Sequence, residues 1–200
     1  MEDKNKNQMC GLDPIGYEYE KNIYRQIKSI EYTINFHHGF EDTTTIVPYL
    51  EILSKATYND VVIFNITSYG GDAETAFTLR NAIKNCKAKT IARVFYAASA
   101  ATILALSCEE IIFMDNCCFM IHGPKCYYEG KLQDLQDKMS FQYKRFCNIM
   151  YDVYKAILSK EEIKEAIQGK EFWFDERECI ERIQKFYKHN NPKKKEKDNA

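Results

Sequence analysis

The chain has 200 residues, of which 45% are hydrophobic and 14% aromatic, enough to build a full core in one domain. A wholly disordered chain is therefore excluded. Its 28 lysines and arginines nearly balance its 29 aspartates and glutamates, and the net charge of −1 provides no field that would draw it to a phosphate backbone. The longest weakly polar run, Tyr96 to Cys108, is shorter than the roughly 20 residues of a membrane-spanning helix. We therefore expect no nucleic-acid partner and no membrane span.

Both ends of the chain are polar. The start carries charges of both signs and lacks the apolar segment of a secretory signal, so we predict a flexible tail over residues 1–16 and a cytoplasmic location. Residues 189–200 contain no apolar side chain large enough to anchor them, which predicts a disordered charged tail. The fold is expected to lie in a single domain, residues 17–188.

Eight cysteines are scattered along the chain, and only Cys117 and Cys118 are adjacent. No Cys-x-x-Cys pair occurs, and no histidine spacing completes a zinc site. A chain of this length does not need a disulfide framework. We therefore predict reduced, mostly buried thiols, no metal and no other cofactor.

Strand-like and helix-like segments alternate between the two ends. Strand patterns occur at residues 31–36, 61–66, 89–95, 110–114 and 118–122, and helical patterns at residues 46–56, 73–85 and 99–107. Val61–Ile66 is a short, continuous β-rich run, typical of a strand that is buried on both faces. This alternation predicts an α/β fold with a mostly parallel sheet and helices on its faces.

From Lys131 onward the apolar pattern acquires the period of a helix. Apolar residues recur at steps of three and four and mark one stripe on a helix of about seven turns: Leu132, Leu135, Met139, Tyr143, Phe146, Ile149, Val153 and Ile157. Such a helix has to pack on something. A short helix over residues 160–167, the run Phe172–Phe174 and a last helix from Asp175 to about Phe186 are expected to follow.

Two segments place small residues beside groups that can carry chemistry. Tyr69–Asp72 follows a buried strand, and its two glycines allow positive φ and let backbone N–H groups face a ligand, although Gly-Gly also serves purely steric needs. Ser99 lies in Ala97–Ala101, between a strand and a helix, where unpaired N–H groups would support an alkoxide or an oxyanion. The alternative is that Ser99 caps the helix.

His122 closes an apolar strand, and Gly123-Pro124 breaks the chain directly after it. Active-site groups of α/β proteins collect at strand ends, which favours a catalytic histidine. A core histidine that hydrogen-bonds to backbone is the alternative.

Four segments in this order resemble the proteolytic subunit of the Clp protease: Ser68–Gly71, Ala97–Ala100, Phe119–Pro124 and Tyr128–Gly130. The resemblance covers residues 23–187 and implies a ClpP/crotonase-like fold of repeated βαβ units with a protruding handle helix. The Lys/Asn/Ile-rich sequence looks like divergent versions encoded by bacteriophages.

The resemblance implies a ring-forming serine endopeptidase that hydrolyses peptide bonds of unfolded proteins or peptides. Ser99 matches the nucleophile of that family and His122 its general base, 23 positions further on. The N–H groups of Gly71 and Ala100 match its oxyanion hole. Glu171 falls where the family has the third member of its catalytic triad.

The resemblance also implies partners. Residues 127–157 match the handle, a strand-like extension and a long helix that interlock two heptameric rings, so a heptamer or a double-ring tetradecamer is expected. An AAA+ unfoldase is the expected further partner, although the charged N-terminus does not match the axial loops that meet it.

Three positions depart from the family pattern. Tyr69 replaces a proline, Ala101 replaces a glycine, and Glu171 replaces the usual aspartate. Asp175 is the nearest true aspartate and competes with Glu171 for the third triad position, but its place at the start of the last helix is typical of an N-cap.

The departures motivate an alternative from another class, a catalytically impaired subunit that acts as an interaction or regulatory component of a ring. A crotonase-like acyl-CoA enzyme would share the fold, but such enzymes use carboxylates rather than a Ser-His pair. A Ser/Lys dyad would need a lysine near Ser99, and His122 is the simpler partner.

Overall fold

A computed structural model describes residues 29–125 and 128–190 of the chain. The predicted tail over residues 1–16 lies outside these ranges. Of the predicted charged tail over residues 189–200, the first two residues belong to the last helix and the others lie outside the described ranges. The last helix runs to Asn190, past the predicted end near Phe186.

In the described part of the chain, five strands form one sheet, and their order in the sheet is their order in the chain. They are β1 (Glu31–Phe36), β2 (Val61–Ser68), β3 (Lys89–Ala98), β4 (Glu110–Ile121) and β5 (Phe172–Phe174). Strands β1 to β4 are parallel, and β5 adds antiparallel to β4. The predicted α/β fold with a mostly parallel sheet is confirmed.

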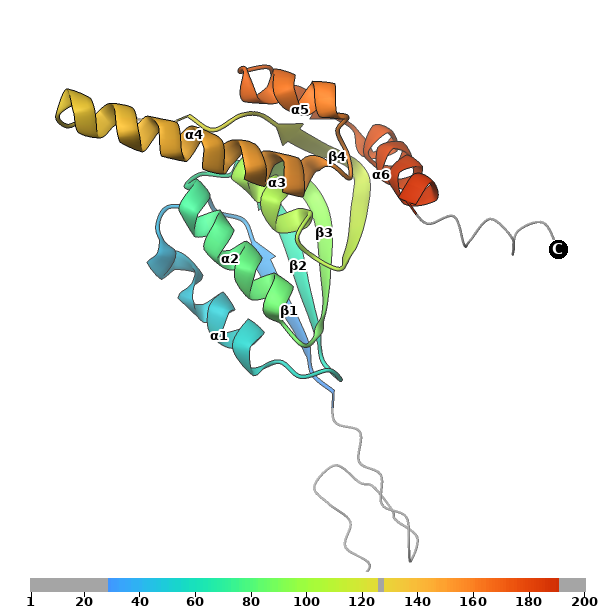
Figure 1. Ribbon diagram of the computed structural model, residues 1–200. Coiled ribbons are helices and arrows are strands. Elements are labelled where there is room, and N and C mark those ends of the chain that lie inside the picture. Colours follow the sequence, from blue (N-terminus) through green and yellow to red (C-terminus); the bar gives the residue numbers. More distant parts are fainter. Residues whose placement is uncertain (1–28, 126–127, 191–200) are drawn as a thin grey trace, which may run out of the picture.

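The helices are η1 (Thr43–Ile46), α1 (Val47–Lys55), α2 (Ala73–Asn85), α3 (Ala100–Ala105), α4 (Leu132–Tyr154), α5 (Lys160–Ile167) and α6 (Glu176–Asn190). Each new parallel strand is added on the same side of the previous one, and crossovers of this kind are right-handed. The connecting helices α1, α2 and α3 therefore cover one face of the sheet, while α6 packs on β4 away from them (Figure 1).

The two strands predicted at residues 110–114 and 118–122 are one strand, β4. Its pairing with β3 jumps from Val94↔Phe113 to Tyr96↔Cys118, and Asn116 within the jump has a φ of 60°. This irregularity is a bulge, which bends a strand without ending its pairing. The polar pair Asp115-Asn116 therefore marks a bulge and not a loop between two strands.

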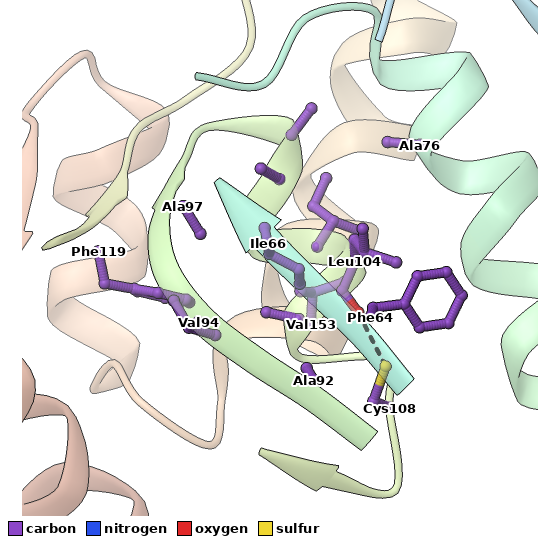
Figure 2. Close-up of a cluster of buried hydrophobic side chains, with 14 of the residues drawn as sticks. Phe64, Ile66, Ala76, Ala92, Val94, Ala97, Leu104, Cys108, Phe119 and Val153 are labelled. Carbon is purple, nitrogen blue, oxygen red and sulfur yellow. Dashed lines mark hydrogen bonds between the residues drawn. The ribbon is translucent and has the colours of Figure 1, made fainter. Parts of the chain in front are cut away.

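The core lies between the sheet and the helices on its covered face. Figure 2 shows Phe64, Ile66 and Val94 of the sheet gathered with Leu104 of α3 and Val153 of α4, all buried. Each fully buried side chain of this size contributes about 1.5–3 kcal/mol to folding. The last turn of α4 is thereby tied to the helix that follows Ser99.

The apolar stripe of α4 divides into two parts. Met150 and Val153 are buried in the core of the chain, whereas Leu132, Met139 and Tyr143 are 84%, 57% and 64% exposed. The first half of α4 projects beyond the rest of the body (Figure 1). The protruding handle helix is therefore present, and its first half exposes the apolar stripe. The described part of the predicted strand-like extension, from Tyr128 onward, forms no strand.

The described cysteines are free thiols, while Cys10 and Cys126 lie outside the described ranges. Burial raises the pKa of Cys108 to about 12 and that of Cys117 to about 11.

Among the described residues, no three histidine, cysteine, aspartate or glutamate side chains are grouped so that they could hold a metal ion. Within the same ranges, no helix combines the length and the apolar character that crossing a bilayer requires.

Candidate active site

The candidate site lies at the carboxyl edge of the parallel sheet. Gly70 and Gly71 follow β2, Ser99 follows β3 and His122 follows β4, so parallel pairing brings them to the same edge. A cavity of about 670 Å³ opens there between the start of α2 and the inner side of α4. Its lining includes all five predicted site residues: Gly71, Ser99, Ala100, His122 and Glu171.

Ser99 occupies a sharp turn between β3 and α3. Its φ of 54° and ψ of −124° lie outside the regions that non-glycine residues favour, a strain of about 1–3 kcal/mol. The turn is held from both sides, because the Ser99 N–H donates to the Met120 carbonyl at 2.8 Å and the Ser99 carbonyl accepts from the Thr102 N–H at 3.0 Å. The Ser99 side chain makes no capping hydrogen bond, so its hydroxyl does not cap α3.

The hydroxyl of Ser99 faces the imidazole of His122 instead. Ser99 Oγ and His122 Nε2 are 2.6 Å apart, and both side chains are half-buried. Burial lowers the pKa of His122, the charge of Glu171 raises it, and the charge of Lys125 lowers it further, with a net shift below the ordinary value. A neutral imidazole with its proton on Nδ1 can accept the hydroxyl proton at Nε2.

Gly70 and Gly71 are both required sterically. A Cβ on Gly70, which has a φ of 94°, would come within 2.5 Å of the Ala98 carbonyl oxygen and 2.8 Å of the Ala100 nitrogen. A Cβ on Gly71, with a φ of 137°, would come within 2.2 Å of the Phe40 carbonyl oxygen. The steric reading of the Gly-Gly pair is therefore correct, and it also lets the loop lie directly against the Ser99 turn.

The same loop orients a free backbone donor. The Phe40 N–H donates to the Gly70 carbonyl at 2.8 Å, and the Asp72 N–H donates to the Phe40 carbonyl at 2.7 Å. The Gly71 N–H belongs to the same trans peptide unit as the Gly70 carbonyl, so it points away from Phe40. The Ala100 N–H, at the first position of α3, has no acceptor within the helix. Within the described residues neither N–H donates a hydrogen bond, and both residues line the cavity beside Ser99.

Glu171 lines the cavity but does not bond to His122. Its carboxylate accepts a hydrogen bond from the Trp173 indole N–H at 3.2 Å, and among the described residues no hydrogen bond joins it to the imidazole. Its charge nevertheless acts on the His122 pKa. The structure therefore places Glu171 near His122 as a through-space partner.

Asp175, the rival carboxylate, lies at the start of α6 and does not line the cavity. Its side chain accepts from the Glu178 N–H at 2.9 Å, and the Glu178 carboxylate accepts from the Asp175 N–H at 3.3 Å. This reciprocal pair is a capping box. Asp175 thus makes the N-cap contacts that its position predicts.

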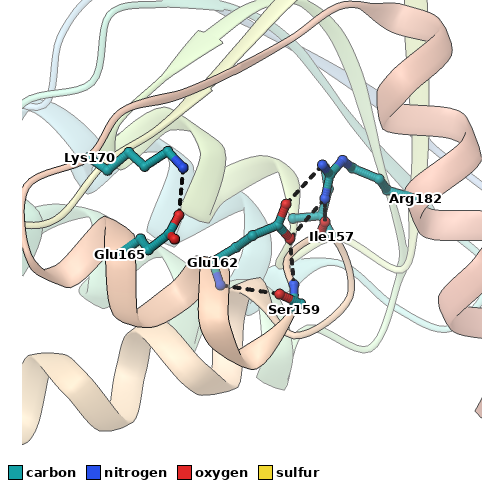
Figure 3. Close-up of polar contacts among 6 residues, drawn as sticks. All are labelled: Ile157, Ser159, Glu162, Glu165, Lys170 and Arg182. Atoms are coloured by element: carbon teal, nitrogen blue, oxygen red, sulfur yellow. Dashed lines mark hydrogen bonds and ion pairs between the residues drawn. The ribbon is translucent and has the colours of Figure 1, made fainter.

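A polar cluster ties α5 and α6 to the strand that follows Glu171. Arg182 of α6 donates two hydrogen bonds to the Glu162 carboxylate, each at 3.0 Å, and one to the Ile157 carbonyl at 3.2 Å (Figure 3). Its guanidinium also lies 4.4 Å from the centre of the Phe174 ring in β5. These contacts join α6 to α5 and to β5. The antiparallel pairing of β5 with β4, with Phe172 opposite Ile121, brings Glu171 to the end of β4 where His122 lies.

The other two departures leave the Ser-His pair intact. The ring of Tyr69 is 80% exposed and lies against Tyr96, with the ring centres 4.8 Å apart. Ala101 is fully buried in α3. Neither side chain takes part in the hydrogen bond between Ser99 and His122.

The cavity also has an apolar wall that the sequence did not assign to the site. Phe77 of α2, Ile103 of α3, and Phe146 and Met150 of α4 line it. The helical period marked Phe146 as apolar, but periodicity carries no information about which partner a stripe will face. These side chains can receive an apolar group beside Ser99.

The fold and the site define an α/β protein with a serine–histidine pair at the carboxyl edge of a parallel sheet. The family model of the Clp protease matches residues 17–182, and the chain therefore belongs to the Clp protease family. Comparison with the curated proteins gave no match. Membership in this family supports peptidase activity and self-association in general terms.

Proposed function

We propose that the protein is a serine endopeptidase with Ser99 as the nucleophile and His122 as the general base. The observation that carries the proposal is the 2.6 Å contact between Ser99 Oγ and His122 Nε2. The Ser99 hydroxyl is available for this contact because it does not cap α3. Ser99 Oγ attacks the scissile carbonyl as His122 takes its proton. The C–N bond then breaks, the proton passes to the leaving amine, and water hydrolyses the acyl-enzyme by the same steps.

The N–H groups of Gly71 and Ala100 would stabilise the oxyanion that forms during attack. Neither N–H has an acceptor among the residues that the structure describes, and both residues line the cavity together with Ser99. Donors that are fixed before the reaction stabilise developing charge without reorganisation, and each is typically worth about 2.7–4 kcal/mol of barrier.

Glu171 is proposed as the acid that favours the imidazolium formed on His122. It acts through its charge, since its carboxylate bonds to Trp173 and not to the imidazole.

The substrates that fit this site are unfolded proteins or peptides in an extended conformation. The apolar wall formed by Phe77, Ile103 and Phe146 suits an apolar side chain next to the scissile bond. We further propose that the protein forms a ring of seven subunits, single or stacked in pairs. An AAA+ unfoldase partner and a cytoplasmic location are part of the same proposal. The exposed apolar half of α4 supports the assembly, because a second copy would cover it.

One observation favours a second candidate, a catalytically impaired ring subunit. The hydrogen bond of Glu171 to Trp173 leaves His122 without a bonded carboxylate among the described residues. Such a subunit would assemble but hydrolyse peptides slowly.

The test of the chemistry is labelling with a fluorophosphonate together with hydrolysis of fluorogenic peptides. Ser99→Ala should abolish both, since loss of a triad nucleophile costs orders of magnitude in turnover. Ser107→Ala removes a serine just beyond α3, whose hydroxyl donates to the Ile103 carbonyl, and should retain both activities. Hydrolysis by Ser99→Ala would refute the nucleophile, and labelling of wild type without hydrolysis would favour the impaired subunit.

The test of assembly is the molar mass by light scattering at micromolar concentration. Met139→Lys and Tyr143→Lys place charge on the exposed half of α4. Each should reduce the molar mass of the assembly, because the handle joins its copies, without unfolding the chain. Lys144→Glu, on the same helix but outside the apolar stripe, is the matched control. A monomeric wild-type protein would refute the proposed role of the handle helix as an assembly surface.

A further inference from the structure

A buried chain of hydroxyl groups reaches the backbone of Ser99 from α4. Thr102 Oγ1 lies 2.6 Å from the Ser99 carbonyl oxygen and 2.8 Å from the hydroxyl of Tyr154. A carbonyl oxygen can only accept, so Thr102 uses its one proton on Ser99, and Tyr154 must donate to Thr102. The direction of the chain is therefore fixed: Tyr154 to Thr102 to the Ser99 carbonyl.

Both hydroxyl groups are shielded from water. Thr102 is fully buried and Tyr154, in the last turn of α4, is 2% exposed. Burial raises the pKa of the Tyr154 phenol, which keeps it protonated and able to donate. Hydrogen bonds in a dry environment polarise one another, so the second bond strengthens the first.

The carbonyl that receives this chain belongs to the same peptide unit as the Ala100 N–H. Because that unit is planar and trans, fixing the direction of the Ser99 carbonyl also fixes the opposite direction of the Ala100 N–H. The Ser99 carbonyl accepts a second hydrogen bond, from the Thr102 N–H, so two donors of one residue hold it. The strained turn at Ser99, with its φ of 54°, is the place where such restraint is needed.

We propose that Thr102 and Tyr154 are positioning residues that aim and polarise the Ser99–Ala100 peptide as an oxyanion donor. The inference rests on the proposed peptidase function and adds two residues to it whose hydroxyl groups act through the Ser99 carbonyl and make no hydrogen bond to the imidazole. A threonine that bonds to a carbonyl three residues earlier is common in helices for purely local reasons. Two features go beyond this local pattern. Tyr154 donates a hydrogen bond to Thr102, and the peptide that Thr102 holds carries the Ala100 N–H of the proposed oxyanion hole.

The experiment compares Thr102→Val, which keeps the shape and removes the hydroxyl, with Thr102→Ser, which keeps the hydroxyl. Thr102→Val should lower kcat by about 10- to 100-fold, part of the loss seen when a whole oxyanion donor is removed, with KM within about twofold. Thr102→Ser should stay within about threefold of wild type in kcat. Tyr154→Phe should have a smaller effect, about 3- to 10-fold, because Thr102 still donates to the Ser99 carbonyl.

Stability and pH dependence separate positioning from general damage. Thr102→Val leaves the Tyr154 hydroxyl buried without a partner, whereas the double variant Thr102→Val/Tyr154→Phe removes both groups and should recover much of the lost thermal stability. Its kcat should remain as low as that of Thr102→Val. The acid limb of the pH profile should not move in any of these variants, because none of them touches His122.

Equal kcat in Thr102→Val and wild type would overturn the positioning role, as would a Thr102→Ser enzyme as slow as Thr102→Val. Recovery of kcat together with stability in the double variant would also overturn it. None of these results affects the assignment of Ser99, which depends on the Ser99→Ala comparison. A wild-type ring that hydrolyses no peptide would overturn both proposals.

Discussion

The third member of the triad can be identified by comparing two substitutions. Glu171→Gln removes the carboxylate charge beside His122, yet the glutamine amide oxygen can still accept from the Trp173 indole N–H. Because Glu171 is exposed, the free energy of unfolding should change by less than about 0.5 kcal/mol. Turnover should fall by more than about tenfold, toward the roughly 10⁴-fold loss that follows removal of a directly bonded triad acid.

Asp175→Ala should have the opposite profile. The substitution removes one acceptor of the capping box, the contact from the Glu178 N–H at 2.9 Å, while the backbone N–H of residue 175 can still donate to the Glu178 carboxylate. Loss of such a cap costs about 1 kcal/mol. In a chain of this size that corresponds to a decrease of about 2–4 °C in the midpoint of thermal unfolding. Turnover should stay within about twofold.

The assay measures kcat for a fluorogenic peptide and thermal unfolding on the same preparations. Glu165→Gln, which removes an exposed carboxylate paired with Lys170, is the matched control for the loss of one negative charge and should change neither quantity strongly. Full turnover in Glu171→Gln would refute its triad role and leave His122 working without that carboxylate. Loss of turnover in Asp175→Ala, at unchanged assembly, would transfer the role to Asp175.

Two further predictions concern pH and the polar cluster beside β5. His122 must be neutral to accept a proton, and its pKa is lowered from 6.5, so kcat/KM should fall as the pH drops through that lowered value. Lys125→Met should move this acid limb to higher pH and Glu171→Gln to lower pH, and coinciding limbs would contradict the proposed base. Arg182→Met should cost about 1–3 kcal/mol, measured by urea unfolding, because it removes two partly buried charge-assisted hydrogen bonds to Glu162. An unchanged midpoint and slope would show that the cluster does not hold α6.

Much of the fold could be predicted from local signals alone. The helix at Ala73–Asn85 begins and ends where the sequence predicts, because Asp72 caps it and its side chain accepts from the Thr75 N–H. The helix at Lys160–Ile167 is also predicted to the residue, since Ser159 and Glu162 form a capping box. Caps, turn residues and apolar periods act over a few residues, so the sequence carries them directly.

The placement of the candidate pair could also be predicted in part. Ser99 and His122 each follow a β-rich segment, and parallel strands bring such positions to one edge. The 2.6 Å contact between them, and the use of the Ser99 hydroxyl for this contact instead of a cap, depend on the strained turn and the bulge in β4. Neither feature has a local sequence signal strong enough to predict it.

What the sequence by itself determined is the order of the elements, the parallel sheet and the chemical types of the residues at its carboxyl edge, because these follow from local propensity and strand order. Only the tertiary structure decided how the stripe of α4 divides, with Val153 inside the core and Met139 exposed. It also decided that Glu171 bonds to Trp173 and that Tyr154 reaches Thr102. These contacts depend on where side chains point and on how far apart folded segments lie. A local sequence pattern specifies neither.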